Sequence, residues 1–168
     1  MKPLFAVIFL IVLFPLFANS QQDTLVMSGL GGKYLGEVNK DGVPHGYGEL
    51  FSNFGGGYIG NWKNGVYHGD GTKTWHTGDV YVGNWNFGNR HGQGRMTWAS
   101  TMYYDGSWKN DNQHGSGEIV YPKGNSRKGK WVHGLMHGKG TYKTESAGEP
   151  HEDNYYHGYF INPGIVYY

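Results

Sequence analysis

The sequence contains no cysteine, only six prolines and few aliphatic side chains. Without cysteine, the chain has no disulfide scaffold, no thiolate nucleophile and no cysteine-ligated zinc site. Net charge is also close to zero, because 14 Lys and Arg oppose 13 Asp and Glu. A chain this close to neutrality lacks the basic surface of nucleic-acid-binding proteins, so nucleic acid is not an expected partner. No motif suggests a cofactor or a small-molecule substrate.

Glycine and aromatic side chains replace the missing aliphatic ones. Thirty of the 168 residues are glycine, well over twice the usual share of about 7%. Tyrosine (14), phenylalanine (8) and tryptophan (6) supply much of the apolar surface. This combination favours strands joined by tight turns and argues against a doubly wound α/β enzyme. The length suits one domain.

Residues 1–20 have the organisation of a secretory signal peptide. Lys2 precedes an apolar run at Leu4–Phe17, and small residues come just before a cleavage site at Gln21. The run is shorter than the roughly 20 residues that span a bilayer comfortably. The sequence therefore predicts a secreted or periplasmic protein. The alternative is an uncleaved signal that anchors the protein in a membrane through residues 4–18.

The rest of the chain is an internal repeat of 23 or 24 residues. The units are residues 34–57, 58–80, 81–103, 104–126 and 127–154, with a lead-in at 21–33 and a partial unit at 155–168. Most units start with tyrosine, have glycine two and tryptophan four residues later, and then contain a His-Gly-x-Gly motif. We interpret the recurring residues as structural: Tyr58, Gly60, Trp62, His68, Gly69, Gly71, Tyr81, Gly83, Trp85, His91, Gly92, Gly94, Tyr104, Gly106, Trp108, His114, Gly115, Gly117, Trp131, His137, Gly138 and Gly140.

Each unit is expected to form one antiparallel β-hairpin. Tyr58, Gly60 and Trp62 have the period-2 spacing that places side chains on one face of a strand. Gly60 should leave a slot between two large rings, in which a neighbouring ring lies flat. The following Asn64-Gly65 is a strong hairpin signal, because both residue types tolerate positive φ.

Five and a half hairpins give about eleven strands, and stacking on neighbours stabilises hairpins that are marginal alone. The predicted fold class is all-β: an elongated, twisted, single-layer antiparallel meander of tandem hairpins. Residues 145–154 are expected to be an acidic insertion between units. The partial unit is expected to lack its second strand and to cap the array.

The pattern Tyr-x-Gly-x-Trp-x-x-Gly-x-x-His-Gly-x-Gly resembles the membrane occupation and recognition nexus (MORN) repeat, from Tyr34 to about Gly164. The sequence departs from that pattern at Val38 (for Trp), Asp111 (for Gly) and Arg127 (for Tyr). The resemblance implies an open single-layer sheet of hairpins. It also implies a role in binding acidic phospholipids, in dimerisation or in protein docking. The catalytic domains that accompany MORN arrays in some enzymes, including lipid kinases, do not occur in this sequence.

The motif histidines are expected to hold the backbone of nearby turns. Equivalent positions in stacked hairpins lie about 9–10 Å apart, too far to share a zinc ion with bonds of about 2.0–2.1 Å. Four further histidines are irregularly spaced: His76, His133, His151 and His157. Of these, His151 with Glu152 and Asp153 is the one metal candidate, and we predict no metal site.

No catalytic constellation is recognisable. The carboxylates Glu37, Asp70, Asp105 and Glu118 occupy different repeat positions and show none of the pairing that glycosidases require. The motif glycines do not form a phosphate-binding loop, because no helix follows them. The sequence therefore predicts a protein that is not an enzyme.

Basic residues gather around the fifth unit, where no acid lies between Glu118 and Glu145. Each basic side chain near an anionic bilayer contributes about 1 kcal/mol within a Debye length. The basic residues therefore predict salt-sensitive attachment to an anionic membrane or envelope surface. The alternative is that they form a solvated edge whose charge is balanced by the acidic segment that follows. The residues are Lys123, Arg127, Lys128, Lys130, Lys139 and Lys143.

The function that the sequence favours is an exported, non-enzymatic binding or scaffold protein, engaging a protein partner or an anionic surface. Self-association is a further expectation, because an open sheet leaves terminal strands unpaired. The alternative function is extracellular carbohydrate binding through exposed aromatic rings. A third hypothesis is a hydrolase whose catalytic residues are not recognisable in the sequence. The aromatic residues outside the repeat pattern are the candidates for sugar contact: Tyr47, Tyr67, Phe87 and Tyr103.

Overall fold

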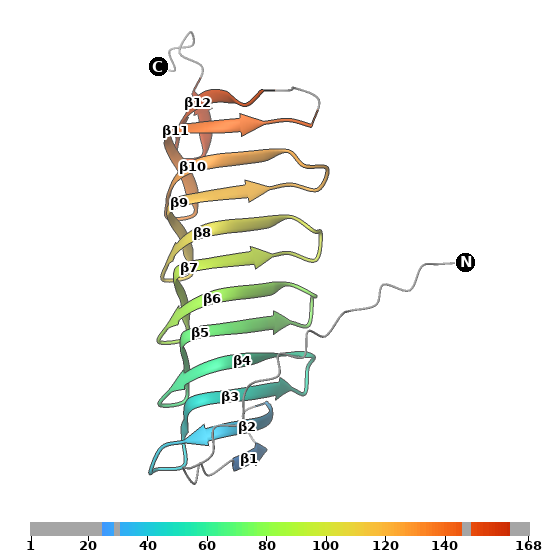
Figure 1. The fold of residues 1–168 in the computed structure, drawn as a ribbon, viewed down its shortest axis with the longest axis vertical. Coiled ribbons are helices and arrows are strands. Elements are labelled where there is room, and N and C mark those ends of the chain that lie inside the picture. Colours follow the sequence, from blue (N-terminus) through green and yellow to red (C-terminus); the bar gives the residue numbers. More distant parts are fainter. Residues whose placement is uncertain (1–24, 29–30, 146–148, 162–168) are drawn as a thin grey trace, which may run out of the picture.

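A computed structural model describes residues 25–28, 31–145 and 149–161, which form one 13-stranded antiparallel sheet in sequence order (Figure 1). The strands are β1 (Leu25–Ser28), β2 (Gly32–Val38), β3 (Pro44–Ser52), β4 (Gly56–Lys63), β5 (Val66–Trp75), β6 (Val80–Asn86), β7 (Asn89–Thr97), β8 (Tyr103–Lys109), β9 (Asn112–Val120), β10 (Ser126–Val132), β11 (Leu135–Lys143), β12 (His151–Tyr156) and β13 (Tyr159–Ile161). The predicted all-β meander is confirmed. The predicted signal peptide lies outside the described residues, and none of the described segments is a helix that could cross a membrane.

The sheet has two strands more than the repeats predict. Strand β1 comes from the lead-in segment and pairs with β2. At the other end, β12 begins at His151, which pairs with Tyr142 of β11, and the short β13 pairs with β12. Residues 151–154 of the expected insertion at 145–154 therefore belong to a strand, and the expected absence of a last second strand is wrong. An uncovered β11 would leave a row of unpaired backbone groups, which β12 satisfies.

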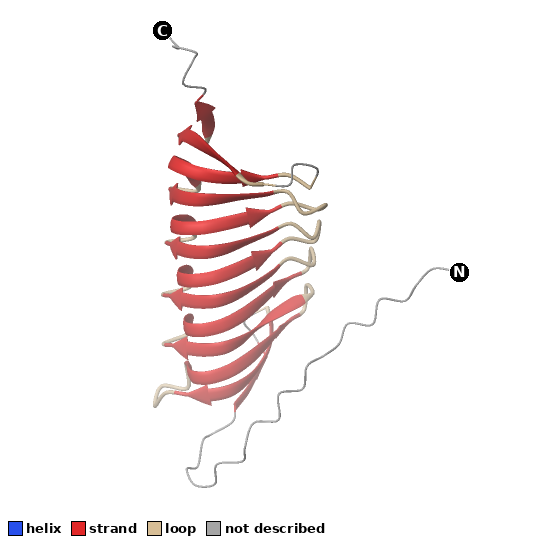
Figure 2. Cartoon of the chain, turned by 45° about the horizontal axis from the view of Figure 1, so that its top comes forward, coloured by secondary structure: helices blue, strands red, loops and turns tan. Residues whose placement is uncertain are grey.

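Glycines of adjacent strands pair with one another in a single row across the sheet. The row runs through Gly36, Gly48, Gly60, Gly71, Gly83, Gly94, Gly106, Gly117, Gly129 and Gly140. The register shifts beside the row within each of these hairpins, as between Gly60 and Trp62. Such irregularities bend strands and increase their twist. Figure 2 shows the result, a sheet whose strands curve across their length.

In each of the first four units, one tyrosine covers this row on the face that carries Tyr58 and Trp62, here called the aromatic face. These four tyrosines, here called the tyrosine column, are fully buried: Tyr34, Tyr58, Tyr81 and Tyr104. A Cβ atom on Gly71 would lie 2.5 Å from Cζ of Tyr58. The slot for the ring is therefore at Gly71, the partner of Gly60, and a ring of the same hairpin fills it. This differs from the slot expected at Gly60.

The tryptophans join each unit to the one before it. The indole Nε1 of Trp108 donates a hydrogen bond of 2.9 Å to the carbonyl of Gly94. Its ring meets the ring of its own Tyr104 edge-on at 5.2 Å and that of the preceding Tyr81 at 5.4 Å. The same hydrogen bond recurs from Trp62, Trp85 and Trp131, at 3.0–3.2 Å. The tryptophans thus make the core continuous from unit to unit.

The tyrosine column predicts alkaline unfolding. Burial, followed by the charge of Glu37, raises the pKa of Tyr34 to about 12, and burial raises the pKa of Tyr58, Tyr81 and Tyr104 as well. Phenols with a folded pKa above the unfolded value of about 10 contribute stability that is complete below pH 10 and is lost above it. We expect the guanidinium midpoint to be constant between about pH 8 and 9.5 and to fall as the pH rises towards about 12.

The phenolate absorbance of the folded protein provides the control for this prediction. The buried phenols, whose pKa is raised by burial, should ionise only when the protein unfolds. A single ionisation step near pH 10 without loss of structure would contradict the prediction.

Candidate functional site

The six predicted basic residues divide between two faces of the sheet. Alternation along β10 places Arg127 on the aromatic face, where its guanidinium lies 5.4 Å from the ring of Tyr142. Lys123 lies in the turn before β10, with a φ of 80°. The other four are exposed on the opposite face of β10 and β11 and form the lysine patch: Lys128, Lys130, Lys139 and Lys143.

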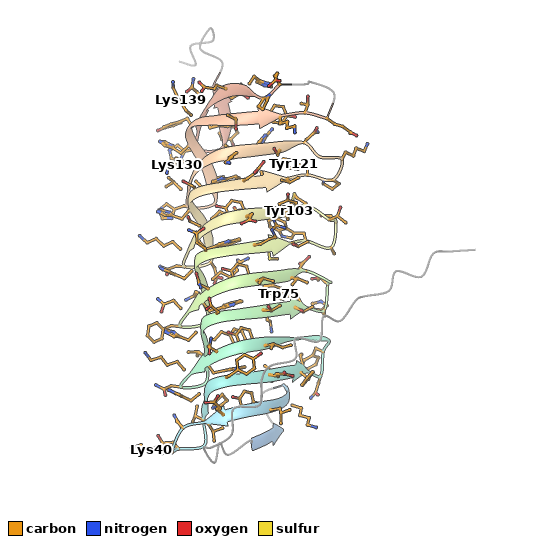
Figure 3. All side chains as sticks on the ribbon, viewed as in Figure 1. Lys40, Trp75, Tyr103, Tyr121, Lys130 and Lys139 are labelled. Carbon is orange, nitrogen blue, oxygen red and sulfur yellow. The ribbon has the colours of Figure 1, made fainter. Side chains whose placement is uncertain are left out.

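The lysine patch is positively charged despite acidic neighbours. In Figure 3, Lys130 and Lys139 project from the same side of the sheet. Lys128 pairs in register with Glu118 of β9, and Glu152 on β12 borders the patch on its other side. Among the described residues, no carboxylate lies within 4.0 Å of any of the four ammonium groups. Nζ of Lys130 donates a hydrogen bond of 2.8 Å to Oγ of Ser116, which is uncharged. The positive charges of the patch therefore remain available to an external anion.

The motif histidines contact the turn of the following hairpin through side chains. His45 Nδ1 lies 3.3 Å from Oδ1 of Asn64, and the ring of His68 meets that of Phe87 edge-on at 5.4 Å. The Nδ1 atoms of His68 and His91 are buried without a hydrogen-bond partner in the described part of the chain. The prediction that the motif histidines hydrogen-bond to turn backbones is therefore wrong for the Nδ1 atoms of His68 and His91.

Two of the irregularly spaced histidines, His133 and His157, are the turn residues that motif histidines contact in the later hairpins. The ring of His114 lies 6.3 Å from that of His133, and the ring of His137 lies 5.9 Å from that of His157. Both His133 and His157 are turn residues with positive φ, as Asn64 and Phe87 are in earlier hairpins. Their position 19 or 20 residues after a motif histidine is the sequence signal that could have identified them.

The three residues of the metal candidate, His151, Glu152 and Asp153, do not come together. His151 Nε2 lies 3.5 Å from Oδ2 of Asp153, whereas alternation along β12 places Glu152 on the other face. Over residues 25–28, 31–145 and 149–161, no three His, Asp or Glu side chains come together in a metal-binding arrangement.

The aromatic residues predicted for sugar contact do not form one platform. Tyr67 stacks on Tyr58 at 3.8 Å and packs, partly buried, against the core. Tyr103 lies on the opposite face beneath the guanidinium of Arg95, at 4.4 Å. Tyr47 lies on strand β3 and Phe87 in the turn after β6, both exposed. A carbohydrate could not touch these rings together.

A cavity that the sequence did not predict opens on the aromatic face of the last two hairpins. Its volume is about 430 Å³, and it is lined by Arg127, Tyr142, His151, Asp153, Tyr155, Gly158 and Tyr159. Burial raises the pKa of Tyr155, and the charge of Asp153 adds to the rise whereas that of Arg127 opposes it. The phenol therefore lies within the influence of a cation and an anion.

Comparison with known families agrees with this geometry. The sequence profile of the MORN repeat matches residues 34–54, 58–80, 81–102, 104–126 and 128–146, which is more than half of the chain. The comparison with curated proteins gives no match. The matched segments contain the buried tyrosines, the glycine row and the motif histidines described above. The chain therefore belongs to the MORN repeat family.

Proposed function

We propose that the protein is an exported, non-enzymatic binding scaffold that attaches to an anionic membrane or envelope surface through the lysine patch. The observation that carries this proposal is the grouping of four exposed lysines on one face of two adjacent strands. At about 1 kcal/mol each, four lysines supply about 4 kcal/mol, which corresponds to a millimolar dissociation constant. Attachment of a single copy is therefore weak and salt-sensitive.

Co-sedimentation with vesicles tests the attachment. We expect the protein to sediment with phosphatidylcholine vesicles that contain phosphatidylglycerol, and less so as salt increases, because salt screens exposed charges. Replacing Lys128, Lys130, Lys139 and Lys143 by glutamine should abolish sedimentation.

A matched control replaces four exposed lysines elsewhere by glutamine: Lys33, Lys40, Lys63 and Lys109. This variant has the same net charge as the patch variant and should sediment like the wild type. Equal loss in both variants would show that net charge, rather than the patch, is responsible. Full sedimentation of the patch variant would overturn the proposal.

Export has its own measurement. The intact mass of the protein recovered from each cell fraction distinguishes a soluble chain that begins at Gln21 from a membrane-bound chain that retains residues 1–20. The first result supports export, and the second supports the anchored alternative.

A protein partner is the second candidate, and a different surface favours it. Leu35, Ile59 and Val82 lie on the opposite face of β2, β4 and β6 and are 39–53% exposed. A groove of about 280 Å³ lies beside Ile59, between Phe51 and Thr74. Exposed apolar groups in such a row are typical of protein-docking surfaces. A scaffold with this arrangement holds a partner at one end and an anionic surface at the other.

A further inference from the structure

The aromatic face departs from the repeat pattern at four neighbouring positions in its last two hairpins. Arg127 stands where the earlier units have tyrosine. In β12, His151 pairs with Tyr142, Asp153 with Gly140 and Tyr155 with Gly138. In the corresponding pairs of earlier hairpins, those three β12 positions are tyrosine, glycine and tryptophan, as in Tyr81, Gly83 and Trp85 of β6. All four departures line the 430 Å³ cavity.

The cavity exists because of these departures. Tyr104, one unit earlier, is fully buried between its glycines and the next tryptophan. Arg127 has no tryptophan after it, because Tyr155 occupies that position, and it is only partly buried. The volume that results is in the range of small-molecule sites, about 300–1,000 Å³.

One wall of the cavity carries a cation without an anionic partner. Within the described segments, no carboxylate lies within 4.0 Å of the guanidinium of Arg127, and its Nε is buried without a hydrogen-bond partner. The guanidinium lies between the rings of Tyr121 and Tyr142, at 5.8 and 5.4 Å. These rings fix the orientation of the guanidinium, which is suited to a planar carboxylate.

The other wall carries a carboxylate that is held in place. Asp153 accepts a hydrogen bond of 3.3 Å from the phenol of Tyr155 and lies 3.5 Å from Nε2 of His151. Its side chain is 13% exposed. A fixed carboxylate repels a small anion but accepts hydrogen bonds from hydroxyl groups. The exposed ring of Tyr159 adds a flat apolar surface.

The ligand that satisfies both walls carries one carboxylate, several hydroxyl groups and an apolar ring face. We propose that the cavity binds a uronic acid residue of an acidic glycan, with the sugar carboxylate on Arg127 and hydroxyl groups on Asp153 and His151. The ring face of the sugar packs on Tyr159. This site is independent of the lysine patch, which lies on the opposite face of the sheet.

Titration calorimetry with digalacturonate tests the proposal on the purified full-length protein. Saturable binding is expected for digalacturonate, and none for a neutral disaccharide of the same size, for acetate or for inorganic phosphate. Absence of saturable heat with digalacturonate, or equal binding of the neutral disaccharide, would overturn the proposal.

Arg127→Tyr is the decisive variant, because it restores the residue that the repeat uses at this position. It should fold with an unchanged circular dichroism spectrum and lose affinity for digalacturonate by about tenfold or more, as expected when a hydrogen bond to a charged group is lost. Asp153→Asn should weaken digalacturonate binding and allow phosphate to bind. Lys128→Gln, beside Arg127 but on the opposite face, should bind digalacturonate like the wild type.

Terminal units of repeat arrays are often atypical because they cap the array. If capping is the whole role of these residues, Arg127→Tyr lowers the melting temperature and digalacturonate does not change it in the wild type. That outcome also overturns the proposal. The vesicle experiment, in contrast, depends on neither Arg127 nor Asp153.

Discussion

Replacement of Trp108 by alanine is expected to lower the free energy of unfolding by about 3–5 kcal/mol, the range for truncation of a buried aromatic side chain. Trp108 is 4% exposed and contacts the rings of Tyr81 and Tyr104. The substitution also removes the donor to the carbonyl of Gly94. It leaves the guanidinium of Arg90, now 4.4 Å from the indole, with only the more distant ring of Tyr81 at 5.9 Å. Both losses add to the free-energy cost of the void that the truncated side chain leaves in the core.

The loss should also change how the protein unfolds. Each hairpin contacts only its neighbours, so a lesion at the middle of the array uncouples the hairpins before it from those after it. Guanidinium unfolding followed by circular dichroism should then broaden or split into two transitions, with a lower m-value. Trp98→Ala is the control, because Trp98 packs against the core from its margin and is only partly buried. A single, unshifted transition for Trp108→Ala would contradict the prediction.

Replacement of Gly71 by alanine is expected to cost about 3 kcal/mol, the upper part of the range for overpacking. The new Cβ would lie 2.5 Å from Cζ and 2.7 Å from Cε2 of Tyr58, and closer still to its Oη. The ring cannot move away, because Tyr67 stacks on it at 3.8 Å and its hydroxyl donates to the carbonyl of Asn61. Chemical unfolding of the variant measures the loss.

Gly88→Ala separates this steric effect from backbone strain. Gly88 has a φ of 83°, and a Cβ atom added there would have no neighbouring atom within 4 Å, so its substitution should cost only the left-handed penalty of about 1–2 kcal/mol. Gly71 has no such φ, so its cost is contact alone. In a Tyr58→Leu background, Gly71→Ala should lose much of its effect, because the shorter side chain leaves the slot open. An unchanged cost in that background would refute the proposed contact.

The hairpins were predictable from the sequence because their signals are local. Tyr58, Gly60 and Trp62 mark a strand, and Asn64-Gly65 marks its turn, whatever surrounds them. The pairing of Gly60 with Gly71 and Gly48 depends on the register between strands, which one unit does not specify. The contact of Tyr58 with Gly71 was missed for that reason.

Strand β12 was not predicted because its residues do not match the repeat pattern. His151, Asp153 and Tyr155 do not match Tyr-x-Gly-x-Trp, yet they pair with β11 in the same register. The need of β11 for a partner, rather than local propensity, places them in a strand. Recognising that register would also have predicted that these residues meet Arg127 on one face.

The basic cluster was predictable as a set of residues but not as a surface. Consecutive residues of a strand point to opposite faces, so Arg127 and Lys128 could not belong to one site once β10 was recognised as a strand. The predicted aromatic candidates failed for a similar reason. Their departure from the repeat pattern was clear, but a common face requires the registers of strands that are far apart in the sequence.

The tryptophan contacts have a consequence for synthesis of the chain. Trp62 covers Tyr34 at 5.2 Å and binds the carbonyl of Gly48, so the first unit becomes complete only after the second has left the ribosome. Assembly therefore trails translation by one hairpin along the array, with the newest unit always incomplete. Arg127 is the last occupant of the tyrosine position in a full unit, and no tryptophan ever arrives to cover it.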